Sequence, residues 1–377
     1  MNDKVLIVNQ CAHGLTVDIA NAFARSQKYK EVVIALGNHL DSIYHLEDSV
    51  KLQKIKEYKT KSTLSRLISW IIATLQLIFL CRWKYKGYEL FLISNPPIDS
   101  FVPNFCANEY STLIFDVYPD GLGNFASKTS LIYRTWAKNN IKFYKNAKYV
   151  YTLTESMAKT IAQYCPLEKI EVVPLWCNSF LPVFDIPKQN NKFLNEHPEL
   201  QGKFIIMYSG NVGLDHDISC LLDVMNNLRG SKVCLVIIGE GYNKPKLQAR
   251  TRELQLEDSC FFYPFQPTDM LPYSLSSADI SVVATKPNGR SSSIPSKVFS
   301  LMQYGRPILC IADSESEIAK LVKKHNIGVV FNVAEVPQLT DFIKKVSETP
   351  ELLVEYGQNS KKSADLYTNK NALRFVK

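Results

Sequence analysis

The sequence lacks the residue spacings that mark disulfide-bonded, zinc-binding or nucleic-acid-binding proteins. Its nine cysteines are dispersed and odd in number, and no pair is spaced as Cys-x-x-Cys. This pattern argues against a disulfide framework or a zinc site and favours the reducing cytoplasm. The formal net charge of +8 suits an anionic ligand or surface, but no zinc-finger spacing or Gly-aromatic RNA-binding signature accompanies it, so we expect no nucleic-acid partner. The opening MNDKVLIVNQ leads directly into a strand pattern, and no signal peptide is expected.

What the 377 residues do contain is a repeated alternation of short apolar runs and helical stretches. With 46% hydrophobic and 21% charged residues, the composition is globular, and the length favours two domains. Runs such as KVLIVN (4–9), EVVIAL (31–36) and KVCLVIIG (232–239) are typical of buried strands. Strands that alternate with helices predict an α/β fold with two parallel sheets, each covered by helices on both faces.

The alternation stops once, and this predicts the domain boundaries. Residues 183–203 are polar and contain a run of asparagines, so we interpret them as a linker with a short entry segment to the second domain. We expect a first domain over 1–182 and a second over 204–349, each resembling a doubly wound nucleotide-binding sheet. The polar segment 350–377 is expected to be helical, and whether it crosses back to the first domain stays open. Ligands bind at the carboxyl ends of the strands in such sheets, which places the expected active site in the interdomain cleft.

One apolar run, 64–81, allows two interpretations. No charged residue occurs between Leu67 and Cys81, and a lysine-rich segment precedes the run. The run is shorter than the roughly 20 apolar residues that span a bilayer. Its basic flanks, with Trp70 and Trp83 near the ends, favour a helix that docks peripherally on the inner face of the cell membrane. The alternative is a helix buried in the first domain, which periodicity does not exclude.

Two glycine-containing turns follow buried strands in the second domain. Gly210 and Asn211 follow FIIMYS, and Gly239 and Gly241 follow VCLVII. Small residues let the backbone approach a phosphate, and the next helix offers free N–H donors. Lys246 is expected within reach of a diphosphate. The alternative is a pair of ordinary turns with exposed lysines.

Two further segments carry candidate ligand-binding groups. In FFYPFQP (261–267), Tyr263 or Phe265 is a candidate for stacking on a base, although such aromatic residues are more often core. In SSSIPSKVFSLMQYGRPIL (291–309), serine hydroxyls, backbone N–H groups and Lys297 are expected to bind diphosphate oxygens. Such donors stabilise a departing diphosphate without supplying a nucleophile. The alternative is an ordinary capped helix.

The first domain offers candidates for the acceptor side of the cleft. FDVYPDGLGN (115–124) places Asp116 and Asp120 just after a strand, where a carboxylate can orient a hydroxyl or take its proton. QCAHGLTVD (10–18) places His13 and Gly14 at the first strand–helix junction. Each of these residues also suits a structural role in a turn or loop.

The order of these motifs resembles that of the family 4 retaining glycosyltransferases, which have the two-Rossmann-domain GT-B fold. YSGNVG, IIGEG, FYPFQP, SSADISVVA and IPSKVFSLMQYGRPIL look like that family's nucleotide-sugar half. The resemblance is strongest over 204–332. The PSK version, together with DVYPD, is similar to bacterial enzymes that build surface polysaccharides on a lipid carrier. The resemblance implies a nucleotide diphosphate sugar donor, usually UDP-linked, retention at the anomeric carbon, and neither a metal nor another cofactor.

The resemblance also implies roles for individual residues. By matching position, the donor-binding set is Gly210 and Asn211 near the diphosphate, Phe265 and Gln266 near the base, Lys297 near the phosphates, and the backbone of Ser293, Ile294 and Pro295 facing the sugar and phosphates. The family commonly has two glutamates, and Ser292 and Ser300 stand at their positions here. Hydroxyls still hydrogen-bond but lose charge-assisted contacts, which leaves the sugar, the donor affinity and the activity open. Asp116 is expected to take the polar role of a histidine found in many members.

The expected function is therefore a glycosyltransferase (EC 2.4) of hexosyl or N-acetylhexosaminyl type. It moves a sugar from a nucleotide diphosphate donor to a lipid-linked saccharide at the cytoplasmic membrane face, in bacterial surface polysaccharide biosynthesis. Lys297 steadies the departing diphosphate and Asp116 meets the acceptor hydroxyl. Two alternatives stay open. One is a catalytically silent nucleotide-sugar-binding partner, motivated by the two serines, and the other is a nucleotide-sugar epimerase, which requires more acids and histidines near the cleft.

Overall fold

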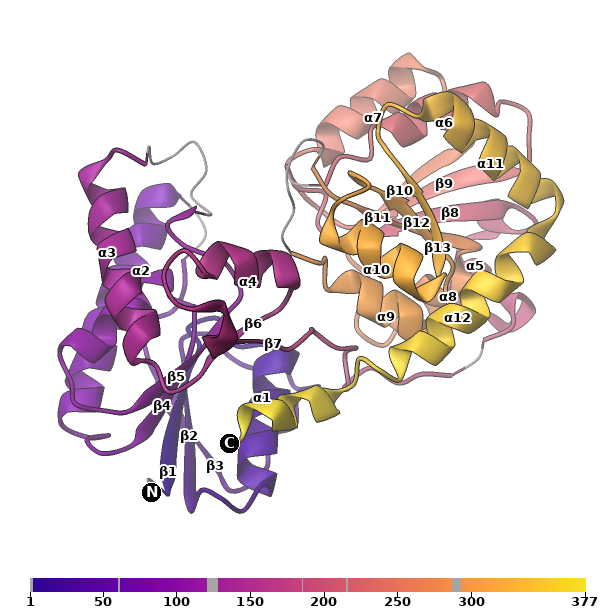
Figure 1. The fold of residues 1–377 in the computed structure, drawn as a ribbon. Helices are drawn as coiled ribbons and strands as arrows, with labels where there is room; N and C mark the ends of the chain where they lie inside the picture. The colour runs from indigo at the N-terminus through magenta and orange to yellow at the C-terminus, as the bar shows by residue number, and fades with distance from the viewer. Residues whose placement is uncertain (1–2, 60–61, 121–127, 185, 215, 287–292) are drawn as a thin grey trace. The chain divides into compact units, whose positions relative to one another are not determined.

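The chain forms two compact units, each built around its own parallel sheet (Figure 1). The computed structural model describes residues 3–59, 62–120, 128–184, 186–214, 216–286 and 293–377. The first unit comprises Met1–Phe180 and Asn369–Lys377, and the second comprises Leu181–Thr368. The prediction of two parallel-sheet α/β domains is confirmed.

The first unit contains a seven-stranded sheet with the order β3-β2-β1-β4-β5-β6-β7. The strands are β1 (Lys4–Val8), β2 (Glu31–Leu36), β3 (Val50–Lys54), β4 (Glu89–Ile93), β5 (Tyr110–Ile114), β6 (Val150–Thr152) and β7 (Ile170–Val172). The helices are α1 (Gly14–Arg25), α2 (Thr63–Arg82), α3 (Leu131–Asn146) and α4 (Glu155–Ile161), with 3-10 helices η1 (Pro97–Asn104), η3 (Leu167–Lys169) and η7 (Asn369–Phe375). Strands β1 and β4 are buried along most of their length because helices cover the sheet.

The second unit contains a six-stranded sheet with the order β10-β9-β8-β11-β12-β13. The strands are β8 (Phe204–Ser209), β9 (Val233–Ile238), β10 (Cys260–Tyr263), β11 (Ile280–Ala284), β12 (Ile308–Ile311) and β13 (Gly328–Phe331). The helices are α5 (Lys192–Glu196), α6 (Cys220–Asn227), α7 (Lys244–Glu253), α8 (Leu271–Ser277), α9 (Lys297–Gln303), α10 (Glu317–His325), α11 (Val336–Glu348) and α12 (Val354–Ala364), with η4 (Lys188–Asn190), η5 (Pro198–Leu200) and η6 (Pro350–Leu353).

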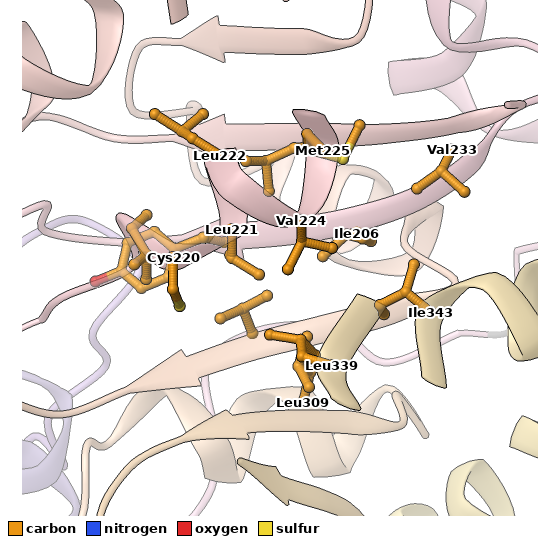
Figure 2. Packing of buried hydrophobic residues seen from close by; sticks show 14 of the residues in the cluster. Ile206, Cys220, Leu221, Leu222, Val224, Met225, Val233, Leu309, Leu339 and Ile343 are labelled. Atoms are coloured by element: carbon orange, nitrogen blue, oxygen red, sulfur yellow. The ribbon is translucent and has the colours of Figure 1, made fainter. Parts of the chain in front are cut away.

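The core of the second unit follows the two-residue period of its strands. Ile206 of β8 packs on one face with side chains of α6 and α11, as Figure 2 shows for Leu221, Val224 and Leu339. Its neighbour Ile205 belongs to the hydrophobic cluster on the opposite face. Successive side chains of a strand point to opposite faces, so one short apolar run fills two layers of core.

The expected linker is wrong for most of its length. Residues 191–200 form α5 and η5, and Phe193, Leu194 and Leu200 are buried with Ile205 on one face of the second sheet. The Asn191 side chain caps α5 by accepting from the Leu194 N–H at 3.1 Å. The sequence did not predict this small helical segment because only three of its apolar side chains pack into the core.

The C-terminal segment divides between the two units. Helices η6 and α12 belong to the second unit, whereas residues 369–377 belong to the first. In η7, the Phe375 ring lies 5.5 Å from the Phe91 ring and 5.0 Å from the Tyr151 ring, measured between centroids. The end of the chain is therefore part of the first unit's core.

Strand β3 was not expected from the sequence. Its residues VKLQK are charged or polar at three positions, and Leu52 is 60% exposed. The strand pairs in parallel with β2, with Val50 opposite Val32 and Lys54 opposite Leu36. An edge strand satisfies its hydrogen bonds on one side and keeps lysines in solvent on the other, which removes the apolar alternation that sequence reading relies on.

Candidate functional site

The topology of the second sheet places a ligand site at the carboxyl ends of β8 and β11. The strand order reverses between these two neighbours, and open α/β sheets bind ligands at such a reversal. The loops that follow β8, β9 and β10 are tied together there. Gly210 donates its N–H to Ile238 O at 2.9 Å, and Gly239 donates to Tyr263 O at 3.0 Å.

The glycines of these loops are required by close backbone packing. Gly239 has φ +134°, and a Cβ on it would lie 2.0 Å from Gly210 O. Gly241 has φ +153°, and a Cβ there would lie 2.4 Å from Val212 O and 2.7 Å from Asn211 Oδ1. Both values of φ belong to a region that residues with a Cβ rarely adopt. The structure thus brings Gly210, Asn211, Gly239 and Gly241 together.

Lys297 points its amine into this group of glycines. A Cβ added to Gly210 would lie 2.7 Å from Lys297 Nζ, so the amine touches the Gly210 backbone. The Nζ atom is shielded from solvent and has no hydrogen-bond partner among the described residues. Burial lowers the pKa of Lys297 to about 7. A buried amine without an anionic partner is costly, and a phosphate placed here would supply that partner.

Tyr208 forms the other wall around the amine and was missed by the sequence reading. Its ring centroid lies 3.7 Å from Lys297 Nζ, and its hydroxyl donates to Asn211 O at 2.7 Å. Burial raises the pKa of the Tyr208 phenol above its usual range. The only signal in the sequence was a tyrosine two residues before Gly210, near the end of the apolar strand FIIMYS.

A pocket of about 340 Å³ lies beside these loops. Its lining includes His216, Lys246 and Lys286, as well as Asn243, whose side-chain amide donates to Gly213 O at 2.9 Å. His216 Nδ1 lies 2.8 Å from Ala284 O at the end of β11. Lys246 also lies over the Tyr242 ring, 5.1 Å from its centroid. The basic groups suit an anionic ligand, and His216 is a second residue that the sequence reading did not select.

The predicted base-contacting residues lie on the neighbouring loop after β10. Phe265 is 55% exposed, and its Cε1 would lie 3.2 Å from a Cβ on Gly239. Its ring is therefore adjacent to the glycine turns and still free to stack on a planar ligand. Gln266 donates its amide to Pro264 O at 3.0 Å, which fixes the turn. Glu240, between the two glycines, forms an ion pair with Lys244 at 2.7 Å.

The remaining donor-side predictions lie around the start of α9. Ser293 is exposed, and Ile294 and Pro295 are half-buried just before Lys297. Ser300 is half-buried in the first turns of α9, where its carbonyl accepts from Tyr304 N at 3.2 Å. Ser292 lies outside the described residues. Gly305 adopts φ +62° just after α9. A glycine with positive φ is typical of a helix C-terminus, so the alternative interpretation of this segment as an ordinary capped helix also fits here.

In the first unit, Asp116 lies two residues beyond β5, at the carboxyl edge of that sheet. Its side chain keeps contact with solvent, yet desolvation by the surrounding protein raises the pKa of its carboxyl above the usual value. Nearby, Ser94 at the end of β4 accepts a hydrogen bond from Phe115 N at 2.9 Å. Asp116 is thus an exposed carboxylate that follows the carboxyl end of β5.

The other first-unit candidates have structural partners. Asp120 accepts hydrogen bonds from Tyr133 at 2.7 Å, Tyr164 at 2.6 Å and Gln163 at 3.0 Å. Both oxygens of its carboxylate are therefore bound by side chains of the same unit. A Cβ on Gly14 would lie 3.0 Å from the Tyr44 ring, which gives this glycine a packing role.

His13 lies at the carboxyl end of β1, where it is the N-cap residue of α1 without a side-chain capping bond. It is exposed, and its Nε2 lies 3.3 Å from Cys11 Sγ. Desolvation lowers the pKa of His13. Among the candidate residues of the first unit, His13 and Asp116 therefore have side chains available to a ligand. The Asp120 carboxylate is held by neighbouring side chains, and Gly14 has a packing role.

Two other features bear on ligand binding. Within the described ranges, no group of three or more His, Cys, Asp or Glu side chains is arranged to hold a metal ion.

A pocket of about 600 Å³ lies at the amino ends of the second sheet, near the Lys188–Asp279 ion pair. It is larger than the pocket at the glycine turns, but it lies at the strand ends that such sheets do not use for ligands.

The fold defines a two-unit α/β protein whose second unit carries a cluster of glycine turns with a shielded lysine. Residues 189–363 match the family model described as "Glycosyl transferases group 1".

Two curated bacterial proteins are similar to the chain. WbjE of Pseudomonas aeruginosa, named a probable glycosyltransferase, is 24% identical over 57% of this chain and 54% of its own length. WcaI of Escherichia coli (strain K12), named provisionally as a colanic acid biosynthesis glycosyl transferase, is 27% identical over 47% of this chain and 43% of its own. The chain spans about half the length of the curated relatives it matches.

Solved structures share the whole fold. HepE of Anabaena, crystallised with UDP and glucose, matches 99% of this chain and 98% of its own with a TM-score of 0.70 and 13% identity. WaaG, a glycosyltransferase involved in lipopolysaccharide biosynthesis, matches 99% of both chains with a TM-score of 0.70 and 14% identity. The chain therefore has the GT-B fold.

Proposed function

We propose that this protein is a retaining, metal-independent glycosyltransferase of bacterial surface polysaccharide biosynthesis. It transfers a sugar from a nucleotide diphosphate donor, UDP-linked, to a lipid-linked saccharide at the inner face of the cell membrane. The domain match, the names of the curated relatives and the order of the loop motifs support the reaction class.

The observation that carries the proposal is the position of Lys297. Its shielded amine lies against Gly210 and faces Tyr208, with no hydrogen-bond partner among the described residues. A diphosphate in this place receives a point charge from Lys297 while the glycine turns let its oxygens approach the backbone. Phe265, exposed beside Gly239, supports stacking on the nucleotide base.

The same groups support the chemical step. The bond between the anomeric carbon and the diphosphate oxygen breaks, the acceptor oxygen bonds to that carbon, and the proton of the acceptor hydroxyl passes to the departing diphosphate. Negative charge develops on the departing diphosphate, and a preorganised amine in a water-poor site stabilises that charge. In this scheme Asp116 hydrogen-bonds the acceptor hydroxyl. Retention follows from the resemblance of the motifs and needs its own test.

Helix α2 supports contact with a membrane. Its outer face consists of large apolar side chains in solvent: Leu64, Leu67, Ile68, Ile71, Ile72, Leu75 and Phe79. Its inner face buries Ala73, Leu77 and Cys81. In the described part of the chain, this is one helix long and apolar enough to cross a membrane by length and composition. Because the inner face is buried in the first unit, we propose that α2 lies on the bilayer rather than across it.

Basic residues occur near α2. Lys51 and Lys54 belong to the edge strand β3, and the segment after that strand contacts α2 where Lys56 N donates to Gln76 Oε1 at 2.7 Å. Lys84 donates to Gln53 of the same strand at 2.7 Å. Lysines around an apolar face favour anionic lipid headgroups, so the expected occupant is an anionic bilayer surface.

An assay of the purified protein tests the proposal against its alternatives. The protein is incubated with UDP-sugars and a lipid-linked acceptor extract, and UDP release is followed together with the anomeric configuration of the product. Acceptor-dependent release supports the transferase. Binding without turnover points to the silent partner that Ser292 and Ser300 motivate, and sugar conversion without acceptor points to an epimerase. Failure of every common nucleotide sugar to bind would overturn all three.

A further inference from the structure

Arg66 of the first unit is a half-buried cation whose Nε atom has no hydrogen-bond partner among the described residues. It follows the α2 N-cap, where the Ser62 side chain accepts from Ser65 N at 3.1 Å. The Arg66 Nε atom is shielded from solvent and has no hydrogen-bond partner among the described residues. Arginines that do form ion pairs in the described part of the chain are Arg25, Arg250 and Arg374. A shielded Nε–H without an acceptor costs free energy, which an anionic ligand bound to the half-buried guanidinium would offset.

An aromatic cluster is built around Trp70, four residues after Arg66 in α2. Trp70 lies one helical turn further along α2, and its ring stacks on Tyr58 with centroids 6.3 Å apart. Trp70 also meets Tyr118 edge-on at 6.3 Å, and Tyr118 stacks on Trp136 at 5.5 Å. The Trp70 Nε1 atom is likewise shielded and has no partner among the described residues. The cluster therefore holds two unused hydrogen-bond donors, one charged and one neutral.

Tyr118 connects Arg66 with Asp116. Burial, with Asp116 nearby, raises the pKa of Tyr118 to about 12, and Arg66 acts in the opposite direction. Both charged groups are therefore close enough to act on the Tyr118 phenol. They form no ion pair with each other, since no contact within 4.0 Å joins them among the described residues. A cation and a carboxylate that stay apart around one tyrosine suit a ligand with an anionic group and a hydroxyl.

We propose that Arg66 binds a phosphate group of the acceptor, with Trp70 Nε1 as a second donor, while Asp116 meets the hydroxyl that receives the sugar. This rests on the proposed function, because it assigns the acceptor end of the same reaction. The guanidinium matches phosphate oxygens in a planar, two-pronged geometry. The phosphate comes either from a lipid diphosphate carrier or from a soluble phosphate ester, and both share this recognition chemistry.

Binding measurements with small phosphates test this site. The intact protein is titrated with farnesyl diphosphate, inorganic diphosphate and farnesol in mild detergent, by calorimetry and tryptophan fluorescence. We expect Arg66→Met to weaken farnesyl diphosphate binding about tenfold or more and Arg66→Lys to weaken it less, since lysine keeps the charge but loses the fork. Arg134→Met is the matched control, because Arg134 is an exposed arginine of the same unit, and we expect it to change nothing.

The phosphate probes then separate the two sources. Tighter binding of farnesyl diphosphate than of inorganic diphosphate assigns a lipid carrier, and equal binding assigns a soluble phosphate ester. The proposal is overturned if neither phosphate binds, if farnesol binds as tightly as farnesyl diphosphate, or if Arg66→Met and Arg66→Lys both bind like the unmodified protein. Circular dichroism confirms that each variant is folded.

A crossed comparison keeps this proposal distinct from the proposed function. Arg66→Met should retain UDP binding, and Lys297→Met should retain farnesyl diphosphate binding. If farnesyl diphosphate binding depends on Lys297 and not on Arg66, the acceptor site is wrong. If UDP-sugars do not bind but the Arg66 dependence holds, the acceptor site stands and the donor assignment fails.

Discussion

Lys297 and Tyr208 meet at the carboxyl edge of the second sheet, with the lysine Nζ 3.7 Å from the centroid of the tyrosine ring. An amine over an aromatic face gains a favourable electrostatic contact. That contact replaces little of the hydration that the shielded Nζ atom has lost, and burial lowers the pKa of Lys297 to about 7. The unligated protein therefore stores an electrostatic cost that a bound diphosphate removes.

Replacing Lys297 should weaken donor binding and stabilise the unligated protein. We expect Lys297→Met to lower UDP affinity by roughly 1.5–3 kcal/mol, the range for a hydrogen bond to a charged group. The same change should raise the free energy of unfolding by ~1–3 kcal/mol, because an unpaired buried amine becomes apolar. Calorimetry and thermal denaturation measure the two effects. Lys203→Met, at the opposite edge of the sheet, is the control, and a Lys297→Met protein that binds UDP normally would contradict the diphosphate assignment.

Donor binding should be pH-dependent. Above pH 7 the unligated protein holds Lys297 increasingly as the neutral amine, whereas a bound diphosphate favours the ammonium. Affinity is therefore expected to fall as pH rises above about 7, by up to roughly tenfold per pH unit, with uptake of a proton on binding. Titrations in buffers of different ionisation enthalpy detect that proton. A pH-independent affinity between 7 and 9 would show that Lys297 is already charged.

The same pKa predicts a slope in stability. The folded protein binds fewer protons than the unfolded chain between about pH 7 and the ordinary lysine value of 10.5. Stability from this group therefore rises with pH across that window. Urea denaturation at pH 7 and pH 9 should show a smaller increase for Lys297→Met than for the unmodified protein. Equal slopes would argue against a depressed lysine pKa.

The glycine turns should tolerate no added Cβ. In Gly239→Ala the new atom would lie 2.0 Å from Gly210 O, so the loop must move and we expect a loss of ~2–4 kcal/mol in stability together with donor binding. Gly230→Ala is the matched control, because Gly230 has φ +76° but nothing within 4 Å of an added Cβ. It should cost only the backbone strain, about 1 kcal/mol. Similar losses of stability in Gly239→Ala and Gly230→Ala would mean that the positive φ alone, and not the close backbone contact, determines the cost.

Asp116 should matter for turnover and not for donor binding. Asp116→Asn keeps the shape but removes the charge, and a group that accepts or orients a proton typically contributes about 10²–10⁴-fold in rate. We expect kcat to fall in that range while UDP affinity stays constant. Asp120→Asn should instead lower the melting temperature, because Asp120 accepts three hydrogen bonds inside the unit. Normal turnover in Asp116→Asn would remove it from the mechanism.

The outer face of α2 should determine membrane recovery. Leu75 and Phe79 are 60% and 59% exposed, so Leu75→Glu with Phe79→Glu should leave the fold intact and abolish flotation with anionic vesicles. Leu352→Glu with Val354→Glu is the control, since these side chains are 44% and 53% exposed in the other unit. Equal flotation of both double variants would reject α2 as the docking surface.

The strands, the turns and several candidate site residues could be predicted from local features of the sequence. Continuous apolar runs predict buried strands such as 233–238 and 204–209, and the glycines after them predict turns. Both signals come from a few neighbouring residues, so they can be recognised in the sequence alone. The selection of Lys297 rested on the same kind of signal. The charged edge strand β3 and the buried segment 191–200 were missed because their stability comes from neighbours distant in the chain.

Only the tertiary structure decided which of the candidate side chains lack partners. Asp120 and Asp116 look equivalent in the sequence, yet one is bound by two tyrosines and a glutamine while the other keeps a side chain open to solvent. Arg66 resembles any helix-start arginine until α2 packs it toward Tyr118, and Lys297 resembles any surface lysine until β8 shields it. The physical reason is that desolvation of a charge depends on all surrounding elements, whereas sequence spacing reports only the element that carries the charge.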